Sequence, residues 1–363
     1  MKKIIFIGNG RDFHAMDWYK NAQIVCYPNK VLFATDLIES EGHARLADDS
    51  INIIELYNID KFLLKKQSKF GDIWRNIVKL LFSPVQIICI KNLAKHNPDA
   101  IFHAHTMYYM YLAWLAKIDF IGTPQGSEIL VRPFKSQFYK YFASKALQAA
   151  KHVTVDSINM QQKTYELSGV KAHIIQNGIA VSEITTFLSS HIYRDKIISI
   201  RGFTPLYRIK EILDARNYLE SEYPISMTYP FWDIEYKNII SEKFIAQDSD
   251  LGKLPLKEDL YKLFSAAFLA ISIPVSDSSP RSVYEAIFCG CCVAVTYNKW
   301  IDILPNCMKS RVLIVDINDK FWLKKAIEES LEITKNIYIP SESALELFDQ
   351  KKSMEKLAKL CYS

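Results

Sequence analysis

The sequence predicts an α/β protein of two domains, each built on a doubly wound parallel sheet. Its 363 residues are about twice a typical domain of ~150 residues. Short apolar runs alternate with segments of helical periodicity through both halves, an order typical of parallel sheets. Most of these runs are continuously apolar, as in strands that helices cover on both faces. We therefore expect two doubly wound sheets.

The apolar runs and helical periods place the elements in order. In the first half we expect strands at Ile4–Ile7, Ile24–Tyr27, Val31–Ala34, Ile51–Leu56, Ala100–His105, Phe120–Gln125, Val153–Asp156 and His173–Gln176, with helices that include Phe134–Ala150 and Met160–Ser168. In the second half we expect strands at Lys196–Arg201, Ile225–Tyr229, Phe268–Pro274, Cys292–Thr296 and Arg311–Val315, and helices at Ile209–Glu220, Lys257–Ala266, Ser282–Cys289, Lys320–Thr334 and Ser343–Leu360.

The turn Asn177-Gly178 is the best boundary between the domains, because residues 179–195 contain no clear strand and resemble a connector. We expect an N-terminal domain at 1–180 and a C-terminal domain at 195–345. A final helix at 346–363 is expected to pack back toward the N-terminal domain. Ligands of such sheets bind beyond the carboxyl ends of the strands, so the functional residues should lie there.

Composition excludes several classes of protein. Hydrophobic residues make up 49% and charged residues 23%, which excludes a disordered chain. A net charge of +5 is too small to indicate nucleic-acid binding. Seven cysteines without regular spacing argue against a disulfide framework. No apolar run has the length of a secretion signal or a membrane span, so we expect a cytoplasmic protein.

The positive charge is concentrated in the first half, with 22 basic and 16 acidic residues before residue 190, against 23 and 24 after it. Between Lys61 and Lys95 eight residues are basic and only Asp72 is acidic. Apolar residues recur there at helical spacing: Phe70, Ile73, Trp74, Ile77, Val78 and Leu81. One interpretation is a helix that packs this stripe on the sheet, with solvated basic residues outside (Lys65, Lys66, Lys69, Arg75 and Lys79). The other is a basic amphipathic helix that lies on an anionic membrane surface.

The segment from Ser276 to Gly290 follows an apolar run and leads into a predicted helix. Ser279 suits the N-cap, Pro280 the first helical position and Gly290 the end of the helix. A helix N-terminus favours a phosphate group, and Arg281 with the hydroxyls of Ser278, Ser279 and Ser282 would add donors. Glu285, about one turn further on, could accept hydrogen bonds from a ribose diol. The alternative is a capped core helix with a solvated charge at each end.

The spacing of this segment resembles the signature of family-four retaining glycosyltransferases. Asp277, seven intervening residues and Glu285 precede an Ala-x-x-x-Gly sequence that ends at Gly290 and an apolar run. The resemblance implies the GT-B fold, two Rossmann-like domains facing across a cleft that holds a nucleotide sugar. The Asp-Ser-Ser-Pro form is similar to a subset with bacterial polysaccharide substrates.

Shorter motifs follow in the family's order and extend the resemblance over nearly the whole chain: Pro98–His105, Thr123–Glu128, Ile175–Gly178, Ser199–Gly202, and Leu251-Gly252 with Leu254-Pro255. The sequence also departs from the family pattern. The family's lysine shortly after the phosphate-binding arginine is missing after Arg201, so Tyr207, Arg208 or Lys210 must replace it, or the contact is absent. Asp277 stands in place of a glutamate, and Gln125 where many relatives carry a histidine.

The resemblance assigns the roles of the site. Glu285 would hold the ribose, while Arg201 and the N–H groups of residues 279–282 would hold the diphosphate, with no metal or other cofactor required. Cys289, Cys291 and Cys292 have no second Cys/His pair at zinc spacing, so we expect buried thiols there. The catalytic candidates are Glu128, Gln125, His105 and Arg201; the donor-binding candidates are Gly8, Gly10, Arg201, Tyr207, Asp277, Ser278, Ser279, Arg281, Ser282 and Glu285. Plain alternatives are a tight turn for Gly8-Asn9-Gly10 and a backbone-bonded strand-end histidine for His105.

We therefore expect a retaining glycosyltransferase that moves a sugar from a nucleoside diphosphate sugar to a bacterial surface glycan or a polyprenyl-linked oligosaccharide. We expect a UDP-sugar, although no residue fixes the base. Peripheral attachment through residues 61–95 to the inner face of the plasma membrane would suit a lipid-linked acceptor. Two other functions stay open. One is a catalytically decayed GT-B binding or scaffold subunit, and the other is a sugar-nucleotide epimerase.

Overall fold

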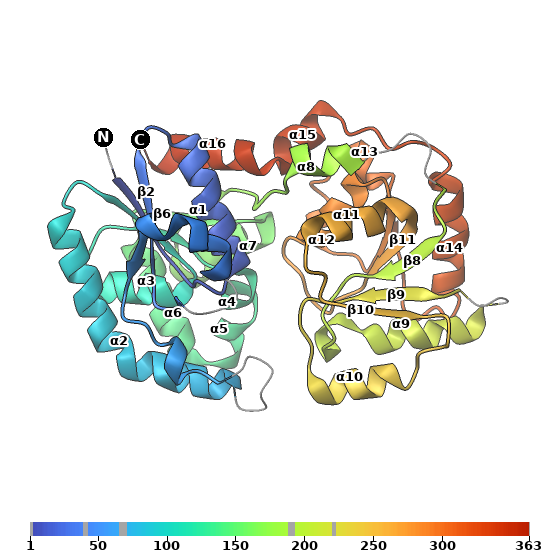
Figure 1. The fold of residues 1–363 in the computed structure, drawn as a ribbon, viewed down its shortest axis with the longest axis horizontal. Helices are drawn as coiled ribbons and strands as arrows, with labels where there is room; N and C mark the ends of the chain where they lie inside the picture. The colour runs from blue at the N-terminus through green and yellow to red at the C-terminus, as the bar shows by residue number, and fades with distance from the viewer. Residues whose placement is uncertain (1–2, 39–42, 65–70, 188–192, 220–222, 363) are drawn as a thin grey trace. The chain divides into compact units, whose positions relative to one another are not determined.

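The computed structural model describes residues 3–38, 43–64, 71–187, 193–219 and 223–362 (Figure 1). The chain forms two compact units. Unit 1 comprises Met1–Asn177 and Gln350–Ser363, and unit 2 comprises Gly178–Asp349. The chain therefore passes from one unit to the other twice.

Unit 1 contains a seven-stranded parallel sheet in the order β3-β2-β1-β4-β5-β6-β7. Its strands are β1 Lys3–Ile7, β2 Lys30–Thr35, β3 Ile53–Glu55, β4 Ile101–His105, β5 Ile121–Thr123, β6 His152–Val155 and β7 His173–Ile174. The strand order reverses between β1 and β4, and the carboxyl ends of these two strands form the switch point where such sheets bind ligands.

Helices cover both faces of this sheet because successive side chains of each strand point to opposite sides. Ile4 and Phe6 of β1 pack in one apolar cluster with α1 and α16, which lie side by side (Figure 1). Ile5 and Ile7 pack in another with α3, α6 and α7. The helices of unit 1 are α1 Phe13–Val25, α2 Gly71–His96, α3 Met107–Leu115, α4 Gly126–Leu130, α5 Arg132–Lys135, α6 Gln137–Ala149, α7 Ile158–Ser168 and α16 Gln350–Cys361, with 3-10 turns η1 His43–Asn52 and η2 Asp60–Phe62.

Unit 2 contains a six-stranded parallel sheet in the order β10-β9-β8-β11-β12-β13. Its strands are β8 Lys196–Ser199, β9 Ile225–Thr228, β10 Ser249–Gly252, β11 Ala267–Ser272, β12 Cys292–Val295 and β13 Val312–Ile314. The strand order reverses between β8 and β11. The predicted pair of doubly wound α/β domains is therefore confirmed.

The helices of unit 2 also lie on both faces of their sheet. Ile198 of β8 packs with α11, α12 and α15, whereas Ile197 packs with α9 and α14. The helices are α8 Val181–Ile184, α9 Ile209–Ala215, α10 Ile234–Ser241, α11 Lys257–Ala266, α12 Arg281–Phe288, α13 Asn306–Lys309, α14 Trp322–Ile333 and α15 Glu342–Phe348, with 3-10 turns η3 Thr185–Phe187, η4 Pro205–Tyr207, η5 Arg216–Tyr218 and η6 Lys299–Ile301.

Several predicted elements are wrong in detail. The expected strand Ile24–Tyr27 does not form, because α1 continues to Val25 and a turn follows it. The edge strand β10 was not predicted, since its first three residues are exposed and carry no apolar signal. The expected helix Ser343–Leu360 is two helices that break at Asp349, whose backbone is extended. The expected connector at 179–195 begins with α8 and η3, and residues 188–192 lie outside the described part.

Candidate functional site

Arg201 and Asp277 meet at the switch point of the sheet in unit 2. Arg201 follows β8 and Asp277 follows β11, so the reversed strand order brings their loops together. Arg201 Nη2 donates to Asp277 Oδ2 at 2.5 Å, and its Nε donates to the hydroxyl of Ser272 at 2.7 Å. The Arg201 and Asp277 side chains are only 13% and 18% exposed. The guanidinium is therefore held in one orientation by a charge-assisted pair.

Asp277 is itself fixed by its surroundings. Its backbone carbonyl accepts a hydrogen bond of 2.9 Å from the Asn298 side chain. Tyr207 stands on the other side of the arginine, with its ring centre 5.6 Å from the Arg201 guanidinium carbon. The structure thus brings together three of the predicted donor-binding residues and turns the Asp277 carboxylate onto Arg201.

A pocket opens beside this group of residues. It is lined by Arg201, Ser272, Pro274, Asp277, Pro280, Val295, Thr296, Asn298 and Trp300. The space in it that a water-sized sphere can reach is about 10 Å³, about what a single water molecule needs. In this structure the pocket has room for about one water molecule, and Arg201 lies on its wall.

The predicted phosphate-binding helix is α12, which borders the same pocket through Pro280. The helix begins at Arg281, and Pro280 rather than the expected Ser279 occupies the N-cap position. Gly290 follows its end with a φ of +83°, a conformation that glycine adopts without strain. The predicted donors Ser278, Ser279, Arg281 and Ser282 are all half-buried around its first turn.

Glu285 lies in the second turn of α12 and is only 6% exposed. It is close enough to Tyr261 and Cys289 to raise the pKa of both, although burial is the larger cause in each case. The carboxylate thus lies inside unit 2 rather than on a solvated end of the helix. This excludes the alternative of a solvated charge at that position.

The three candidates for the missing family lysine have different surroundings. Lys210 is exposed and donates to Asp214 at 2.8 Å, which is one turn away on the same helix. Tyr207 contacts Arg201, as described above. Arg208 has a φ of +52° and lines a second, more open groove of unit 2 together with Thr296, Tyr297, Ile314, Val315, Asp316, Ile317 and Asn318. Arg208 is therefore the basic candidate that faces a groove.

In unit 1 two acceptor-side candidates meet at the switch point of the other sheet. Asp12 follows β1 and caps α1 through its Oδ1, which accepts from the His14 backbone at 3.1 Å. Its Oδ2 accepts from the Gln125 side chain at 2.5 Å and lies 3.7 Å from His105 Nδ1. Burial lowers the pKa of His105 well below its usual value, so the ring is neutral. Asp12 therefore joins these candidates, although it was not among the site residues predicted from the sequence.

The Glu128 carboxylate binds backbone N–H groups rather than facing a pocket. Its Oε2 accepts from the backbone N–H of Gln125 at 2.9 Å and of Met107 at 2.8 Å, so one carboxylate caps both α4 and α3. Arg132 lies 3.6 Å from Oε1. The side chain is buried, and burial raises its pKa. These contacts indicate that Glu128 positions the loop that carries Gln125.

Close packing leaves no room for a side chain at Gly10 and little room at Gly8. A Cβ on Gly10 would lie 2.2 Å from the Leu37 carbonyl oxygen, and one on Gly8 would lie 3.3 Å from the Phe33 ring. The Gly10 N–H donates to Thr35 Oγ1 at 3.0 Å. The loop after β1 is thus fixed against the end of β2, as the tight-turn alternative expects.

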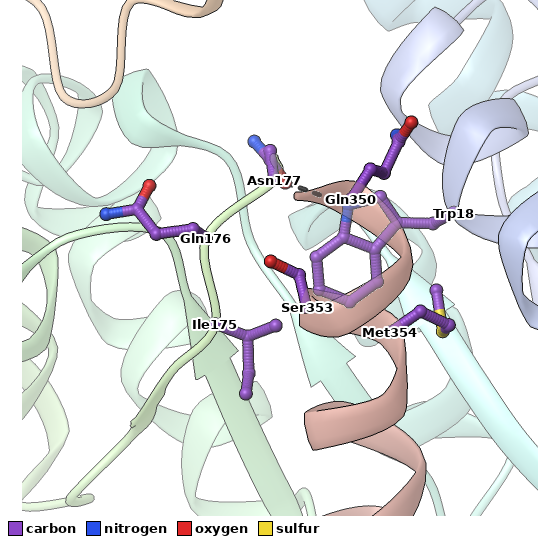
Figure 2. Close-up of a pocket in the computed structure, with 7 residues that line it drawn as sticks. All are labelled: Trp18, Ile175, Gln176, Asn177, Gln350, Ser353 and Met354. Atoms are coloured by element: carbon purple, nitrogen blue, oxygen red, sulfur yellow. Dashed lines mark hydrogen bonds between the residues drawn. The ribbon is translucent and has the colours of Figure 1, made fainter. Parts of the chain in front are cut away.

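A pocket of unit 1 lies where the chain leaves this unit and returns to it (Figure 2). It is lined by Trp18, Ile175, Gln176, Asn177, Gln350, Ser353 and Met354. The Trp18 indole ring points into the middle of the group, and its N–H donates to the Asn177 side chain at 2.8 Å (Figure 2). This pocket contains none of the predicted site residues.

All seven cysteines are free thiols. Cys289, Cys291 and Cys292 are fully buried, and burial raises the pKa of each. Within the described ranges, no three His, Cys, Asp or Glu side chains form a group that could hold a metal ion.

Known proteins resemble this chain in part of its sequence and over nearly all of its fold. Residues 71–183 match the family model described as Glycosyltransferase Family 4. No curated protein sequence matches the chain significantly.

Solved GT-B structures share the fold over nearly the entire length. HepE of Anabaena in complex with UDP superimposes with a TM-score of 0.72 at 13% identity, covering 98% of each chain. Sucrose-phosphate synthase of Thermosynechococcus elongatus gives 0.72 at 14% identity, covering 99% of this chain and 98% of that one. The lipopolysaccharide outer core galactosyltransferase WaaB gives 0.65 at 11% identity, covering 99% and 100%. The predicted GT-B fold is therefore confirmed.

Proposed function

We propose that the protein is a retaining glycosyltransferase that moves a sugar from a UDP-sugar to a bacterial surface glycan or a lipid-linked oligosaccharide. The observation that carries the proposal is the oriented Arg201 guanidinium at the switch point of unit 2, beside the first turn of α12. Two similar structures support the choice of partners: HepE is bound to UDP-glucose in one, and WaaB is described as a galactosyltransferase of the lipopolysaccharide outer core.

In this proposal unit 2 binds the donor. A phosphate of the nucleoside diphosphate binds the Arg201 guanidinium at the mouth of the pocket, and the backbone at the start of α12 adds the partial positive charge of a helix N-terminus. Glu285 accepts hydrogen bonds from the ribose. Arg208 supplies the second basic group in place of the missing lysine, because Lys210 is already bound to Asp214.

Negative charge grows on the diphosphate as the glycosidic bond breaks. Groups that are fixed before the reaction stabilise this charge without reorganising. Asp277 and Ser272 hold Arg201 in that way, so Asp277 is a positioning residue here. The leaving phosphate accepts the proton of the acceptor hydroxyl, and the configuration of the sugar is retained.

Unit 1 binds the acceptor in this proposal. Asp12, His105 and Gln125 offer a carboxylate, a neutral ring and an amide at one switch point. A neutral imidazole can accept a hydrogen bond from a sugar hydroxyl, and a carboxylate can do the same. Glu128 keeps Gln125 in place by capping α4.

The test has two stages. Thermal unfolding against a panel of nucleotides and nucleotide sugars should show a raised melting temperature with UDP or UDP-sugars, because a ligand of the native state stabilises it. Transfer is then measured as release of UDP. Removing one fixed donor at such a centre costs roughly 10²–10³-fold in rate, so we expect that loss for Arg201→Ala and a severe loss for Glu285→Ala. Lys210→Ala is the matched control and should stay near the wild type, because the Lys210 ammonium is exposed and donates to Asp214.

The outcomes separate the competing functions. Near-normal transfer in both Arg201→Ala and Glu285→Ala would contradict the proposal. Nucleotide binding without any transfer or hydrolysis would favour a decayed binding subunit. An altered nucleotide sugar as product after incubation with donor alone would indicate an epimerase.

A further inference from the structure

One face of α2 exposes large apolar side chains along most of its length. The exposed fractions are 61% for Ile73, 41% for Trp74, 43% for Ile77, 74% for Leu80, 66% for Leu81, 40% for Val85 and 59% for Ile88. At 3.6 residues per turn these positions fall within roughly 140° of the helix circumference. We call these seven residues the α2 stripe. Water solvates such a continuous apolar surface poorly, and large exposed patches of this kind mark interaction sites.

The opposite face of α2 is anchored in unit 1 by apolar and polar contacts. Val78 and Ile90 are buried, and Gln86 donates to the Asp36 carboxylate at 3.0 Å. The Lys79 ammonium lies 4.2 Å from the ring centre of Tyr108 and 4.9 Å from that of Tyr109. Lys79 is therefore buried and not among the solvated lysines that the packing interpretation expected.

These contacts decide how α2 can meet a membrane. By length and composition, Ile73–His96 is the helix of the described chain that could cross one. A crossing helix would have to give up the contacts of Lys79 and Gln86 with the core of unit 1. The geometry therefore allows the stripe to face lipid while α2 stays packed on its sheet.

The charge around the stripe is mostly positive, and Asp72 is the acidic residue in the sequence of α2. The sequence from Ile73 to His96 contains no Asp or Glu. Lys91 and Lys95 are exposed near one end of α2, and Lys61 is exposed just before its other end. Trp74 donates its indole N–H to the Phe62 carbonyl at 2.7 Å, which ties the segment around Lys61 to the helix. Lys65, Lys66, Lys69 and Phe70 of the predicted basic segment lie outside the described residues.

We propose that the α2 stripe lies in the boundary layer of an anionic lipid surface, with Lys61, Lys91 and Lys95 over its acidic headgroups. An apolar face flanked by basic residues is the pattern of helices that lie in the membrane plane, and an anionic surface attracts each nearby lysine.

A second copy of the chain fits the α2 stripe less well. A two-fold contact between stripes would bring the lysine-flanked ends together, and like charges repel there. This inference does not depend on the proposed transferase activity.

The test is binding of the full chain to vesicles, measured by co-sedimentation. We expect binding to vesicles of equal parts phosphatidylglycerol and phosphatidylcholine, much weaker binding to phosphatidylcholine alone, and weakening by salt. Leu81→Glu should lower the partition coefficient at least tenfold, because it removes an exposed apolar side chain that inserts into the lipid and adds a charge of the same sign as the headgroups. Ile24→Glu is its matched control, since Ile24 on α1 is also 66% exposed, and it should bind as the wild type does.

The charge is tested separately. Lys91→Glu with Lys95→Glu should lower binding to the anionic vesicles about tenfold or more, whereas Lys196→Glu with Lys309→Glu, two exposed lysines of unit 2, should change it little. Thermal unfolding of each variant shows that it is folded. Absence of binding by the wild type would overturn the proposal. So would equal losses in Leu81→Glu and Ile24→Glu, or a wild-type dimer that Leu81→Glu dissociates.

Discussion

At the scale of single residues, the two histidines of β4 are held neutral inside unit 1. Burial lowers the pKa of His103 to about 3 and that of His105 well below its usual value. His103 hydrogen-bonds Tyr362 Oη through Nδ1 and Thr123 Oγ1 through Nε2, each at 2.7 Å. A protonated ring could donate at both nitrogens, so at least one of these neighbours would have to reorient.

The consequence is a stability that depends on pH. Below pH 6.5 His103 is protonated in the unfolded chain but not in the native chain. The unfolded state therefore binds more protons, and the free energy of unfolding decreases as the pH is lowered. Between pH 7 and pH 5 His103 should account for about 2 kcal/mol of this loss. His103→Gln, which does not titrate, should show a pH dependence smaller by that amount in urea unfolding at both pH values.

Other titrating groups do not affect this comparison of wild type with His103→Gln. Glu128 has a raised pKa and therefore acts in the opposite direction, but it is present in both proteins. An equal loss of stability in wild type and His103→Gln between pH 7 and pH 5 would show that His103 titrates alike in both states.

Which residues could be predicted from sequence depended on how far their partners lie along the chain. Glu285 and Arg281 stand in one helix, so spacing alone placed them together. Asp277 and Arg201 are 76 residues apart, and their ion pair follows only from the strand order. Asp12 and Gln125, 113 residues apart, meet for the same reason. Lys79 was expected in solvent, because helical spacing does not show that two tyrosine rings of α3 cover it.

At the scale of elements, the loop between β1 and α1 shows that the glycines of a sequence typical of a ligand-binding loop can also be explained by packing. Gly8 and Gly10 were predicted to bind the donor, but the structure gives each a steric reason within unit 1. Asp12 closes the loop by capping α1, and Arg11 pairs with Asp60 at 3.0 Å. The loop is therefore tied to the carboxyl end of the sheet at several points.

Gly10→Ala tests this explanation. The new Cβ would meet the Leu37 carbonyl oxygen, and backbone cannot give way as a side chain can. Forcing such a contact costs about 1–3 kcal/mol, which urea unfolding of the full chain would measure. Gly8→Ala meets only side-chain atoms at 3.3–3.4 Å and should cost less.

The same variants separate packing from donor binding. If Gly10 acts through packing alone, Gly10→Ala weakens stability and leaves the affinity for UDP unchanged. A large loss of UDP affinity with unchanged stability would support the predicted donor-binding role.

Strands were predicted correctly where most of their consecutive residues are apolar and buried. The five strands predicted in the second half all form, because each is apolar along most of its length. Burial also explains the failures. The run Ile24–Tyr27 is apolar, yet its first half ends a helix in which Ile24 is 66% exposed. An apolar run of four residues cannot by itself separate a strand from the end of a helix.

At the scale of the whole molecule, the C-terminal helix α16 completes unit 1 although it follows all of unit 2 in sequence. Met354, Leu357 and Tyr362 are buried in the cluster that contains Phe6 and Trp18. Tyr362 also holds His103. The apolar spacing of α16 could be predicted from the sequence. Its position beside α1 could not, because it depends on a contact between distant parts of the chain that no local sequence pattern indicates.

Deleting residues 350–363 should therefore unfold unit 1 selectively. Each large apolar side chain contributes about 1.5–3 kcal/mol when buried, so losing three of them removes roughly 5 kcal/mol or more, as much as a marginally stable domain has in total. Unit 2 keeps its sheet and its Arg201–Asp277 pair, because both lie within Gly178–Asp349. Amide hydrogen exchange should show protection lost across residues 3–177 and kept in 193–349, with UDP still slowing exchange around α12.

Tyr362→Phe, which removes one hydroxyl and keeps the ring, is the control and should cost only about 1 kcal/mol. Unchanged protection of β1 and β4 in the truncated chain would show that unit 1 is stable without α16.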